Sequence, residues 1–360
     1  MTLNSSSLLT QVIANIKPID PQRIAEAQRH LDSLTKPLGS LGQLETIAAQ
    51  MFAITDGNFH LPLHRGAYVF AADHGVVDEG VSAYPREVTV QMVYNFLQGG
   101  AAINVLARMH HAELTVIDVG VDVEFADAPG LRRAKVRRGS RNMHLEPAMT
   151  QDEMLAALEV GIHLAREAKE KNQSLVAVGE MGIGNTTAAS AIAVMLTKQS
   201  TDAVTGMGAG LNGQGKTHKQ QIIDESIKLH FSAQNLSPTP LDILRCVGGL
   251  EIAAMTGFIL GCASHRIAVV CDGFISTAAA ALAAAMASAT GGYLFAGHCS
   301  QEPGQRPLLR LIGRTPILSL DMRLGEGTGA VLAMPIIESS LRLFSEMATF
   351  SSAGVSTSKQ

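Results

Sequence analysis

The chain has 360 residues, of which 46% are hydrophobic, and its 28 basic and 32 acidic side chains give a formal net charge of −4. A chain of this length and composition can bury the core of one large domain with a smaller satellite. The slightly acidic balance gives no sign of a nucleic-acid or membrane-surface partner. The absence of Trp and the aromatic content of 4% argue against a surface that stacks single-stranded bases.

Four cysteines occur in the chain, and no two of them have the spacing of a redox or metal-binding pair: Cys246, Cys262, Cys271 and Cys299. Three of them lie in apolar stretches, which predicts free, buried thiols in a reducing compartment. Residues 1–17 lack the pattern of a signal peptide, and the longest apolar run, 275–289, is too short to span a bilayer. We therefore expect a cytoplasmic protein.

Two patterns of secondary structure follow each other along the chain. Residues 21–53 favour helices, which Pro and Gly interrupt between residues 37 and 42. From residue 66 onward, short apolar runs precede helical patterns, and a last helix is expected from Thr328 to Phe344. Such alternation indicates a doubly wound α/β fold, with a mostly parallel sheet and helices on both faces. The expected strands cover residues 67–73, 114–120, 174–180, 266–273, 293–296 and 316–320.

We expect this order of elements to give three segments. Residues 1–65 would supply helices of a smaller lobe, residues 66–325 a Rossmann-like catalytic domain, and residues 326–360 a C-terminal helix and a polar tail. In doubly wound folds the ligand lies at the carboxyl ends of the strands. Polar residues of this chain gather at those ends: Asp73, His74, Asp118, Glu180, Asp272 and His298.

Residues 210–217 match the formal P-loop pattern, and residues 267–272 resemble the acidic strand of a nucleotide hydrolase. A P-loop binds phosphate because a strand leads straight into a loop of free amides and then into a helix. Glycines break the stretch before residue 210, which argues against such a loop. A nucleotide hydrolase that uses Lys216, Thr217 and Asp272 nevertheless stays an alternative.

Two glycine-rich segments are candidates for binding and chemistry. Residues 179–187 place free amides and a helix start after a strand, which suits an anion but also an ordinary capped turn. Residues 325–329 place Glu326 among three glycines. A partly desolvated Glu has a raised pKa and can accept a proton near neutral pH. A solvated helix-capping Glu explains this motif alone slightly better.

Two further features favour simple explanations. The basic residues between 132 and 138 alternate with apolar ones, which predicts an exposed strand or loop face rather than a phosphate patch. The pairs Asp73-His74 and His298-Cys299 do not supply three or four ligands on one framework, so we expect neither a metal nor another cofactor.

Long blocks of the sequence carry a resemblance, and they cover residues 34–45, 72–85, 98–104, 179–187, 247–257, 272–276, 297–302 and 322–329. Together they closely resemble the nicotinate-nucleotide–dimethylbenzimidazole phosphoribosyltransferases of cobalamin lower-ligand synthesis. The resemblance implies that a nitrogen of 5,6-dimethylbenzimidazole attacks C1′ of nicotinate mononucleotide. Nicotinate leaves, and the product is α-ribazole 5′-phosphate with inverted configuration at C1′. A homodimer with active sites near its interface is implied as well.

The same resemblance assigns the chemistry to a small set of residues. Glu326, next to Gly325 of its motif, is the general base that takes the N–H proton of the incoming base. Glu180 lies near the incoming base and the ribose, and the amides of Met181 and Gly182 lie near the phosphoribosyl group. Asp272 is a second polar residue at a strand end that faces the site.

Phosphate contacts and the acceptor pocket follow from the resemblance in the same way. Four residues are expected to contact the phosphate: Gly206, Gly208, Lys219 and Ser300. Tyr84, Met92 and Met181 would line the pocket, and benzimidazoles, adenine and phenols all stay possible as acceptors. An inactive paralogue that partners a true transferase is a further alternative, against which the presence of Glu326 argues.

Overall fold

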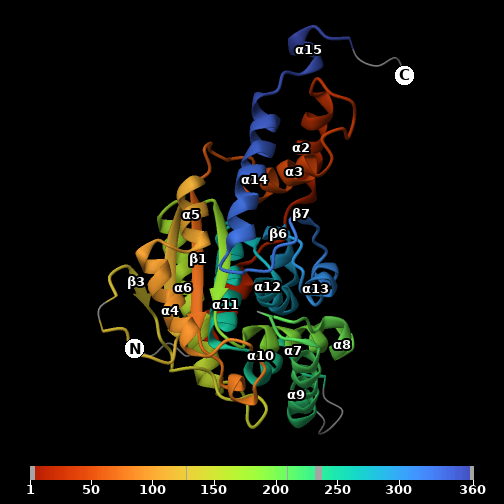
Figure 1. Cartoon of the computed structure of the whole chain (residues 1–360). Helices are drawn as coiled ribbons and strands as arrows, with labels where there is room; N and C mark the ends of the chain where they lie inside the picture. Colours follow the sequence, from red (N-terminus) through yellow and green to blue (C-terminus); the bar gives the residue numbers. More distant parts are fainter. Residues whose placement is uncertain (1–4, 127, 209, 232–236, 357–360) are drawn as a thin grey trace.

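A single parallel sheet organises the fold of the computed structural model, which describes residues 5–126, 128–208, 210–231 and 237–356 (Figure 1). The sheet has seven strands in the order β3-β2-β1-β4-β5-β6-β7, and each neighbouring pair is parallel. All six expected strands are confirmed. The strands are β1 (Arg65–Ala72), β2 (Ala112–Gly120), β3 (Leu131–Arg133), β4 (Leu175–Met181), β5 (Ala268–Cys271), β6 (Leu294–His298) and β7 (Pro316–Leu318).

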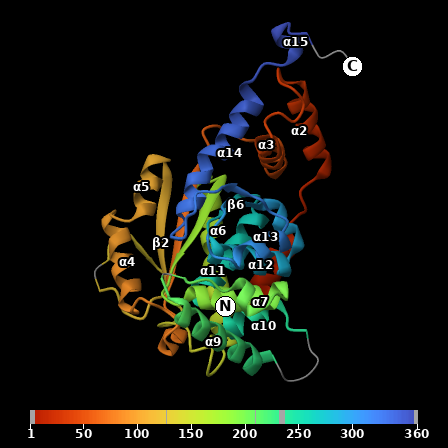
Figure 2. The same cartoon turned by 45° about the vertical axis from the view of Figure 1, so that its right-hand side comes forward.

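Helices cover both faces of this sheet, as the continuous apolar strands predict (Figures 1 and 2). One face packs against α4 (Glu87–Gln98), α5 (Ala102–Met109) and the first part of α14 (Thr328–Glu346). The other face packs against α11 (Leu250–Ser264) and α12 (Phe274–Met286), with α6 (Gln151–Glu170) on top of α11. The expected α/β class is therefore confirmed.

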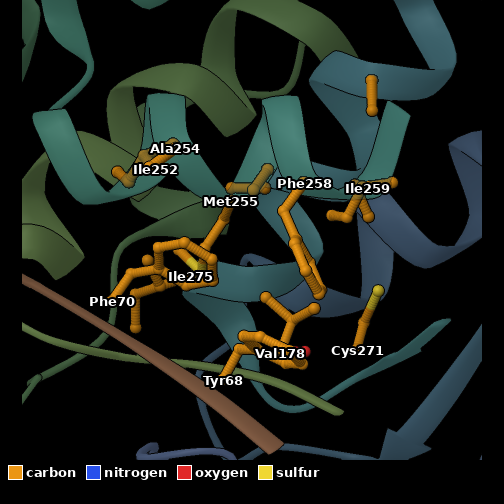
Figure 3. Packing of buried hydrophobic residues seen from close by; sticks show 14 of the residues in the cluster. Tyr68, Phe70, Val178, Ile252, Ala254, Met255, Phe258, Ile259, Cys271 and Ile275 are labelled. Atoms are coloured by element: carbon orange, nitrogen blue, oxygen red, sulfur yellow. The ribbon is translucent and has the colours of Figure 1, made fainter. Parts of the chain in front are cut away.

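Buried side chains of α11 pack against those of the strands in the hydrophobic core (Figure 3). The rings of Tyr68 and Phe258 lie 4.5 Å apart, and Phe70 packs against the same Phe258 at 5.6 Å. Two glycines let α6 approach α11 closely. A Cβ on Gly161 would lie 1.9 Å from the carbonyl oxygen of Ala254, and one on Gly257 would lie 2.0 Å from that of Leu158.

After β1 the chain adds β2 and β3 toward one edge of the sheet, and from β4 onward it adds strands toward the other edge. The direction therefore reverses between β1 and β4. Ligands of doubly wound sheets bind outside the carboxyl ends of the strands at such a switch point. Several helices gather beyond this edge of the sheet (Figure 1). They are α7 (Asn185–Thr197), α8 (Thr201–Val204), α9 (Gly213–Phe231) and α10 (Pro240–Val247). Helix α13 (Gln305–Leu311) lies beside α12, and the short 3-10 segment η1 (Gly75–Glu79) precedes α4.

A smaller helical lobe stands at the opposite end of the molecule (Figure 2). It joins α2 (Pro21–Ser33) and α3 (Gln43–Ile54) to the last part of α14. The ring of Phe344 packs against those of Phe52 and Phe59 at 5.3 and 6.1 Å. The remaining elements are α1 (Ser5–Asn15), η2 (Ser288–Tyr293) and α15 (Phe350–Ala353).

The N-terminal helix α1 does not join this lobe. It packs against α6 and α11, and Leu9, Val12 and Ile16 of the chain start are buried in the main core. The apolar spacing of these three residues supplies one helix face, and the α/β body offers the larger apolar surface to cover it.

The basic segment after β2 is an exposed face, as expected. Arg132 and Arg133 of β3 are exposed, and Arg132 pairs with Glu167. Lys135 pairs with Asp118 at 3.0 Å, and Arg138 pairs with Asp122 at 3.1 Å. The exposed arginines of the cluster therefore form surface ion pairs, whereas Lys135 pairs with a buried carboxylate. Within the described parts of the chain, no helix is both long and apolar enough to cross a membrane.

Candidate active site

A cavity of about 710 Å³ opens at the carboxyl ends of β4 and β6. Its walls come from the segment between η1 and α4, the turn between β4 and α7, the start of α12, and the loops around residues 207, 300 and 325. Nine of the residues expected at the site line this cavity: Tyr84, Met92, Glu180, Met181, Gly182, Gly208, Ser300, Gly325 and Glu326. Gly206, Lys219 and Asp272 are not among the lining residues and lie behind the wall.

Glu326 lies in an unusual stretch of backbone. Gly325, Glu326 and Gly327 have φ values of 87°, 64° and 89°, so a non-glycine residue adopts the left-handed region between two glycines. This conformation costs a non-glycine residue about 1–2 kcal/mol. Glu326 is 5% exposed, and its Oε2 has no hydrogen-bond partner among the described residues. A carboxylate oxygen is thus held at the cavity wall without a partner of its own.

Asp272 holds this stretch in place from beneath. The Gly327 N–H donates to Oδ2 at 2.9 Å, and the Gly329 and Ala330 N–H groups donate to Oδ1 at 2.6 and 3.1 Å. Both oxygens therefore satisfy amides at the start of α14 that would otherwise lack a partner. Burial raises the pKa of Asp272, whereas nearby His298 and these amides lower it. The three N–H groups favour the ionised form, and this carboxylate supports the Glu326 loop.

The last strand residues before Glu180 let the loop approach the sheet. A Cβ on Gly179 would lie 2.2 Å from the Gly327 nitrogen and 2.4 Å from the carbonyl carbon of Glu326. A Cβ on Gly325 would lie 2.5 Å from Glu180 Oε1. The two glutamates are therefore brought together because glycines stand where other side chains would separate them.

The two glutamates differ in their surroundings. Burial raises the pKa of Glu180 to about 8, and the charges of Glu251 and Asp272 add to this effect. Glu180 therefore carries a proton at neutral pH, and its Oε2 interacts with Asn185 Nδ2. Burial also raises the pKa of Glu326, with a contribution from Asp272, while the backbone N–H of Ile103 opposes the rise. Unequal environments of this kind separate acid and base roles in one site.

A cationic group lies behind the other end of the cavity. Lys219 of α9 is fully buried, and its Nζ donates to Thr186 Oγ1 at 2.7 Å. Burial lowers the pKa of Lys219 to about 8, and the charge of Glu302 opposes this effect. A Cβ on Gly208 would lie 3.4 Å from Nζ, so the glycine loop passes directly over the ammonium group. This end suits an anion such as a phosphate.

Apolar side chains line the rest of the cavity. Met92, Met181, Val81 and Val88 surround a space beside Glu180, and Tyr84 is 49% exposed at its mouth. Thioether and aliphatic surfaces adapt to flat apolar ligands. The cavity therefore combines an apolar end, two glutamates and a cationic end.

Three polar residues that the sequence did not single out as binding residues belong to the site: Asn185, His298 and Glu302. Asn185 and Glu302 stand within recognised sequence blocks, yet no spacing marks them as partners of Glu180 and of the glycine loop. His298 was expected at a strand end. Its Nε2 lies 3.5 Å from Asp272 Oδ1, and neither ring nitrogen has a hydrogen-bond partner in the described residues.

The P-loop interpretation is wrong. Residues 213–217 form the first turns of α9, and between residues 201 and 212 the described residues form helix α8 and turns rather than a strand. The Nζ of Lys216 faces Asp202 Oδ1 at 3.5 Å, away from the cavity lining. Asp272 binds backbone amides of α14 instead of a nucleotide-bound metal. A formal pattern match lacked the preceding strand that gives a P-loop its geometry.

The imidazole of His74, which follows β1, pairs with a carboxylate. His74 Nε2 lies 2.7 Å from Glu251 Oε1, and both side chains are buried. In the described part of the chain, no group of three or more His, Cys, Asp and Glu side chains is arranged to hold a metal ion.

Comparison with known proteins identifies the family of the chain. A family model described as "Phosphoribosyltransferase" matches residues 16–355. A Geobacter sulfurreducens protein named nicotinate-nucleotide--dimethylbenzimidazole phosphoribosyltransferase is 51% identical over 349 residues, 97% of this chain and 98% of that protein. A protein of that name from Chlorobaculum parvum is 50% identical over 346 residues, 96% and 97% of the two chains. The crystal structure of CobT from Thermus thermophilus matches with a TM-score of 0.88 at 46% identity, covering 94% of this chain and 100% of that one.

Proposed function

We propose that this chain, which belongs to the nicotinate-nucleotide–dimethylbenzimidazole phosphoribosyltransferase family, transfers the 5-phosphoribosyl group of nicotinate mononucleotide to 5,6-dimethylbenzimidazole. The products are α-ribazole 5′-phosphate and nicotinate, with inversion at C1′. One observation carries the proposal: the Glu326 carboxylate, whose Oε2 has no hydrogen-bond partner among the described residues, lies at the wall of a cavity with an apolar end and a cationic end. The relatives are named as phosphoribosyltransferases, so they support neither the nucleotide hydrolase nor the inactive paralogue.

Glu326 acts as the general base. One ring nitrogen of the benzimidazole attacks C1′, and the ring becomes cationic as the bond forms. The N–H of the other ring nitrogen must then lose its proton. Glu326 Oε2 accepts that proton, because its raised pKa suits proton transfer near neutral pH. Nicotinate departs with the bonding electrons and its ring becomes neutral, so the leaving group needs no acid. A positioned base contributes on the order of 10²–10⁴ in rate, and alignment of the two substrates contributes further.

Glu180 acts as a neutral hydrogen-bond donor beside the base. A protonated carboxyl can donate to a ring nitrogen or a ribose hydroxyl, which an ionised one cannot. Its pKa of about 8 keeps the proton in place at neutral pH. The apolar surfaces of Tyr84, Met92 and Met181 then hold the benzimidazole ring.

The phosphate of the nucleotide binds at the cationic end. Lys219, Ser300 and Gly206 are the proposed contacts, and the amides of Met181 and Gly182 lie near the phosphoribosyl group. The Gly208 N–H already donates to Glu302 Oε1 at 2.9 Å, so Gly208 contributes mainly by its lack of a side chain. An ammonium group that can donate further hydrogen bonds and a glycine backbone without side chains fit a phosphate dianion.

The protein acts as a cytoplasmic homodimer in this proposal, with residues 66–325 as the catalytic part and residues 1–65 and 326–360 around it. Four free cysteines are consistent with a reducing compartment. Leu320 and Leu324 are 55% and 56% exposed in the segment that leads to Glu326, and such apolar residues suit an interface near the site. A molar mass of twice the chain mass by light scattering is expected, and a monomer at all concentrations would contradict the dimer.

The test is direct synthesis by the purified protein. Nicotinate mononucleotide and 5,6-dimethylbenzimidazole should yield equimolar α-ribazole 5′-phosphate and nicotinate by chromatography. A parallel panel with benzimidazole, adenine and phenol ranks the acceptors. If the protein transfers the phosphoribosyl group to none of these acceptors, the proposed function is refuted.

A further inference from the structure

Glu302 is a buried carboxylate that has no assigned role at the cationic end of the cavity. It is 8% exposed and lies just after β6. Its Oε1 accepts the Gly208 N–H at 2.9 Å, and its own backbone N–H donates to Ser300 Oγ at 3.2 Å. Glu302 thus contacts Gly208 through its side chain and Ser300 through its backbone.

The glycine loop rests directly on this carboxylate. A Cβ on Gly206 would lie 2.1 Å from Glu302 Oε2, so no other residue fits there without displacing the side chain. Oε2 is buried and has no hydrogen-bond partner among the described residues. Gly208 has a φ of 55°, which its bond to Glu302 helps to maintain. Glu302 therefore determines the path of the loop across the cavity end.

Lys219 approaches the same loop from its other side. Its Nζ can donate three hydrogen bonds, and Thr186 Oγ1 is the one partner found among the described residues. A Cβ on Gly208 would lie 3.4 Å from Nζ and 3.1 Å from Thr186 Oγ1. The carboxylate and the ammonium group therefore flank one stretch of glycine backbone.

We propose that Glu302 is a positioning residue for the nucleotide phosphate: it fixes the loop at residues 206–208 and supplies the counter-charge of the buried Lys219 ammonium group. The inference rests on the proposed function, because it assigns the phosphate to this end of the cavity. Glu302 acts through Lys219 and the loop. It does not contact the anion, which its own charge would repel.

Arg323 donates to the carbonyl oxygen of Gly208 at 3.4 Å, and the other charged groups on the elements around Lys219 have partners elsewhere. Asp202 of α8 accepts from Gln220 and pairs with Lys216, and Asp224 of α9 binds Thr201. His218 of α9 contacts the carbonyl oxygen of Glu79. Among the described residues, Glu302 is the carboxylate whose charge acts on Lys219 and raises its pKa against the effect of burial.

The experiment measures binding of nicotinate mononucleotide by calorimetry at pH 6 and pH 8.5, without acceptor base. Glu302→Gln keeps an acceptor for the Gly208 N–H and removes the charge, so the pKa of Lys219 should fall by about one unit. From a starting value of about 8, the variant should bind within about twofold of wild type at pH 6 and about eightfold more weakly at pH 8.5. Comparison at equal pH cancels the titration of the ligand phosphate.

Four further variants separate the two parts of the role. Glu302→Ala also loses the loop anchor and should bind at least about tenfold more weakly at both pH values. Lys219→Gln should bind weakly, and adding Glu302→Gln to it should no longer change the pH dependence of binding. Asp202→Asn removes an exposed carboxylate from the same region and should bind like wild type. Thermal midpoints of all variants identify any that fail to fold.

Parallel pH dependence of Glu302→Gln and wild type would overturn the counter-charge. Tighter binding of the variant at both pH values would show that Glu302 only repels the phosphate. Wild-type affinity of a folded Glu302→Ala at pH 6 would overturn the loop anchor. The same series with inorganic phosphate alone keeps the outcome separate from the transferase assay, whose failure would count against the proposed function instead.

Discussion

Replacing Asp272 with asparagine tests how the proposed base is held. The carboxylate accepts the N–H groups of Gly327, Gly329 and Ala330. An asparagine keeps one acceptor oxygen and presents an NH₂ group where the other oxygen was. At least one of the three amides then faces a donor, beside a left-handed Glu326 with a φ of 64°.

The expected effect follows from these contacts. Loss of one hydrogen bond to a charged acceptor costs about 1.5–3 kcal/mol, comparable with the strain of about 1–2 kcal/mol at Glu326. A loss of about 1.4 kcal/mol lowers the population of the strained conformation tenfold, so kcat should fall roughly 10- to 100-fold. The KM for the nucleotide should change little, because Lys219 and Ser300 lie at the other end of the cavity. The charge of Asp272 raises the pKa of Glu326, so its removal lowers that pKa.

The assay is the pH dependence of kcat with both substrates saturating. Glu326 must be ionised to act, so a lower pKa moves the acid limb of the profile to lower pH while the plateau falls. Asp118→Asn is the matched control. Asp118 is also buried at a strand end, where it accepts the Val121 N–H at 2.9 Å and pairs with Lys135. It should lose stability without a shift of the limb. An Asp272→Asn profile with the wild-type plateau and limb would refute this account of how Glu326 is held.

Three other changes test separate parts of the structure. Glu180→Gln mimics the protonated carboxyl. The Glu180 carboxyl ionises near pH 4.5 in the unfolded state and only near pH 8 in the folded state, so the wild-type fold is destabilised as the pH rises through this window. The variant should therefore gain more thermal stability over wild type at pH 8.5 than at pH 5. An equal gain at both pH values would contradict the raised pKa. Gly179→Ala places a Cβ 2.4 Å from the carbonyl carbon of Glu326, so turnover should fall at least about 100-fold while circular dichroism stays that of a folded protein, and normal turnover would exclude the close approach. Phe344→Ala removes the ring at the centre of the small lobe and should cost about 3–4 kcal/mol in chemical unfolding with little change in KM, whereas a loss below about 1 kcal/mol would show that the lobe packs otherwise.

Most of the sheet could be predicted because its strands are buried on both faces. The strands β1 and β4 read as continuous apolar runs, and their polar ends mark the edge where Glu180 and Asp272 lie. The short β3 carried only an alternating basic pattern, which does not distinguish a strand from a loop. Where a helix packs in the fold was harder to predict than the fact that it is a helix. Helix α1 packs on the α/β body because of tertiary apolar surface that the local sequence does not reveal.

The site was partly visible in the sequence. Glycines around Glu326 suggested a special backbone, yet the motif alone suited a helix cap slightly better. The support from Asp272 joins residues 55 positions apart, and no local pattern predicts it. The same holds for Glu302, which is 94 positions from Gly208. The P-loop match failed for the opposite reason, since a local pattern was present and the strand that it needs was not.

The central claim is that Glu326 accepts the proton of the incoming base. Single turnover of bound nicotinate mononucleotide by Glu326→Gln, with saturating 5,6-dimethylbenzimidazole, tests it most directly because binding and product release are separated from the chemical step. We predict a rate of nicotinate release about 10²–10⁴ below wild type, with nucleotide affinity within about twofold. A single-turnover rate within about tenfold of wild type would contradict the assignment of Glu326 as the base.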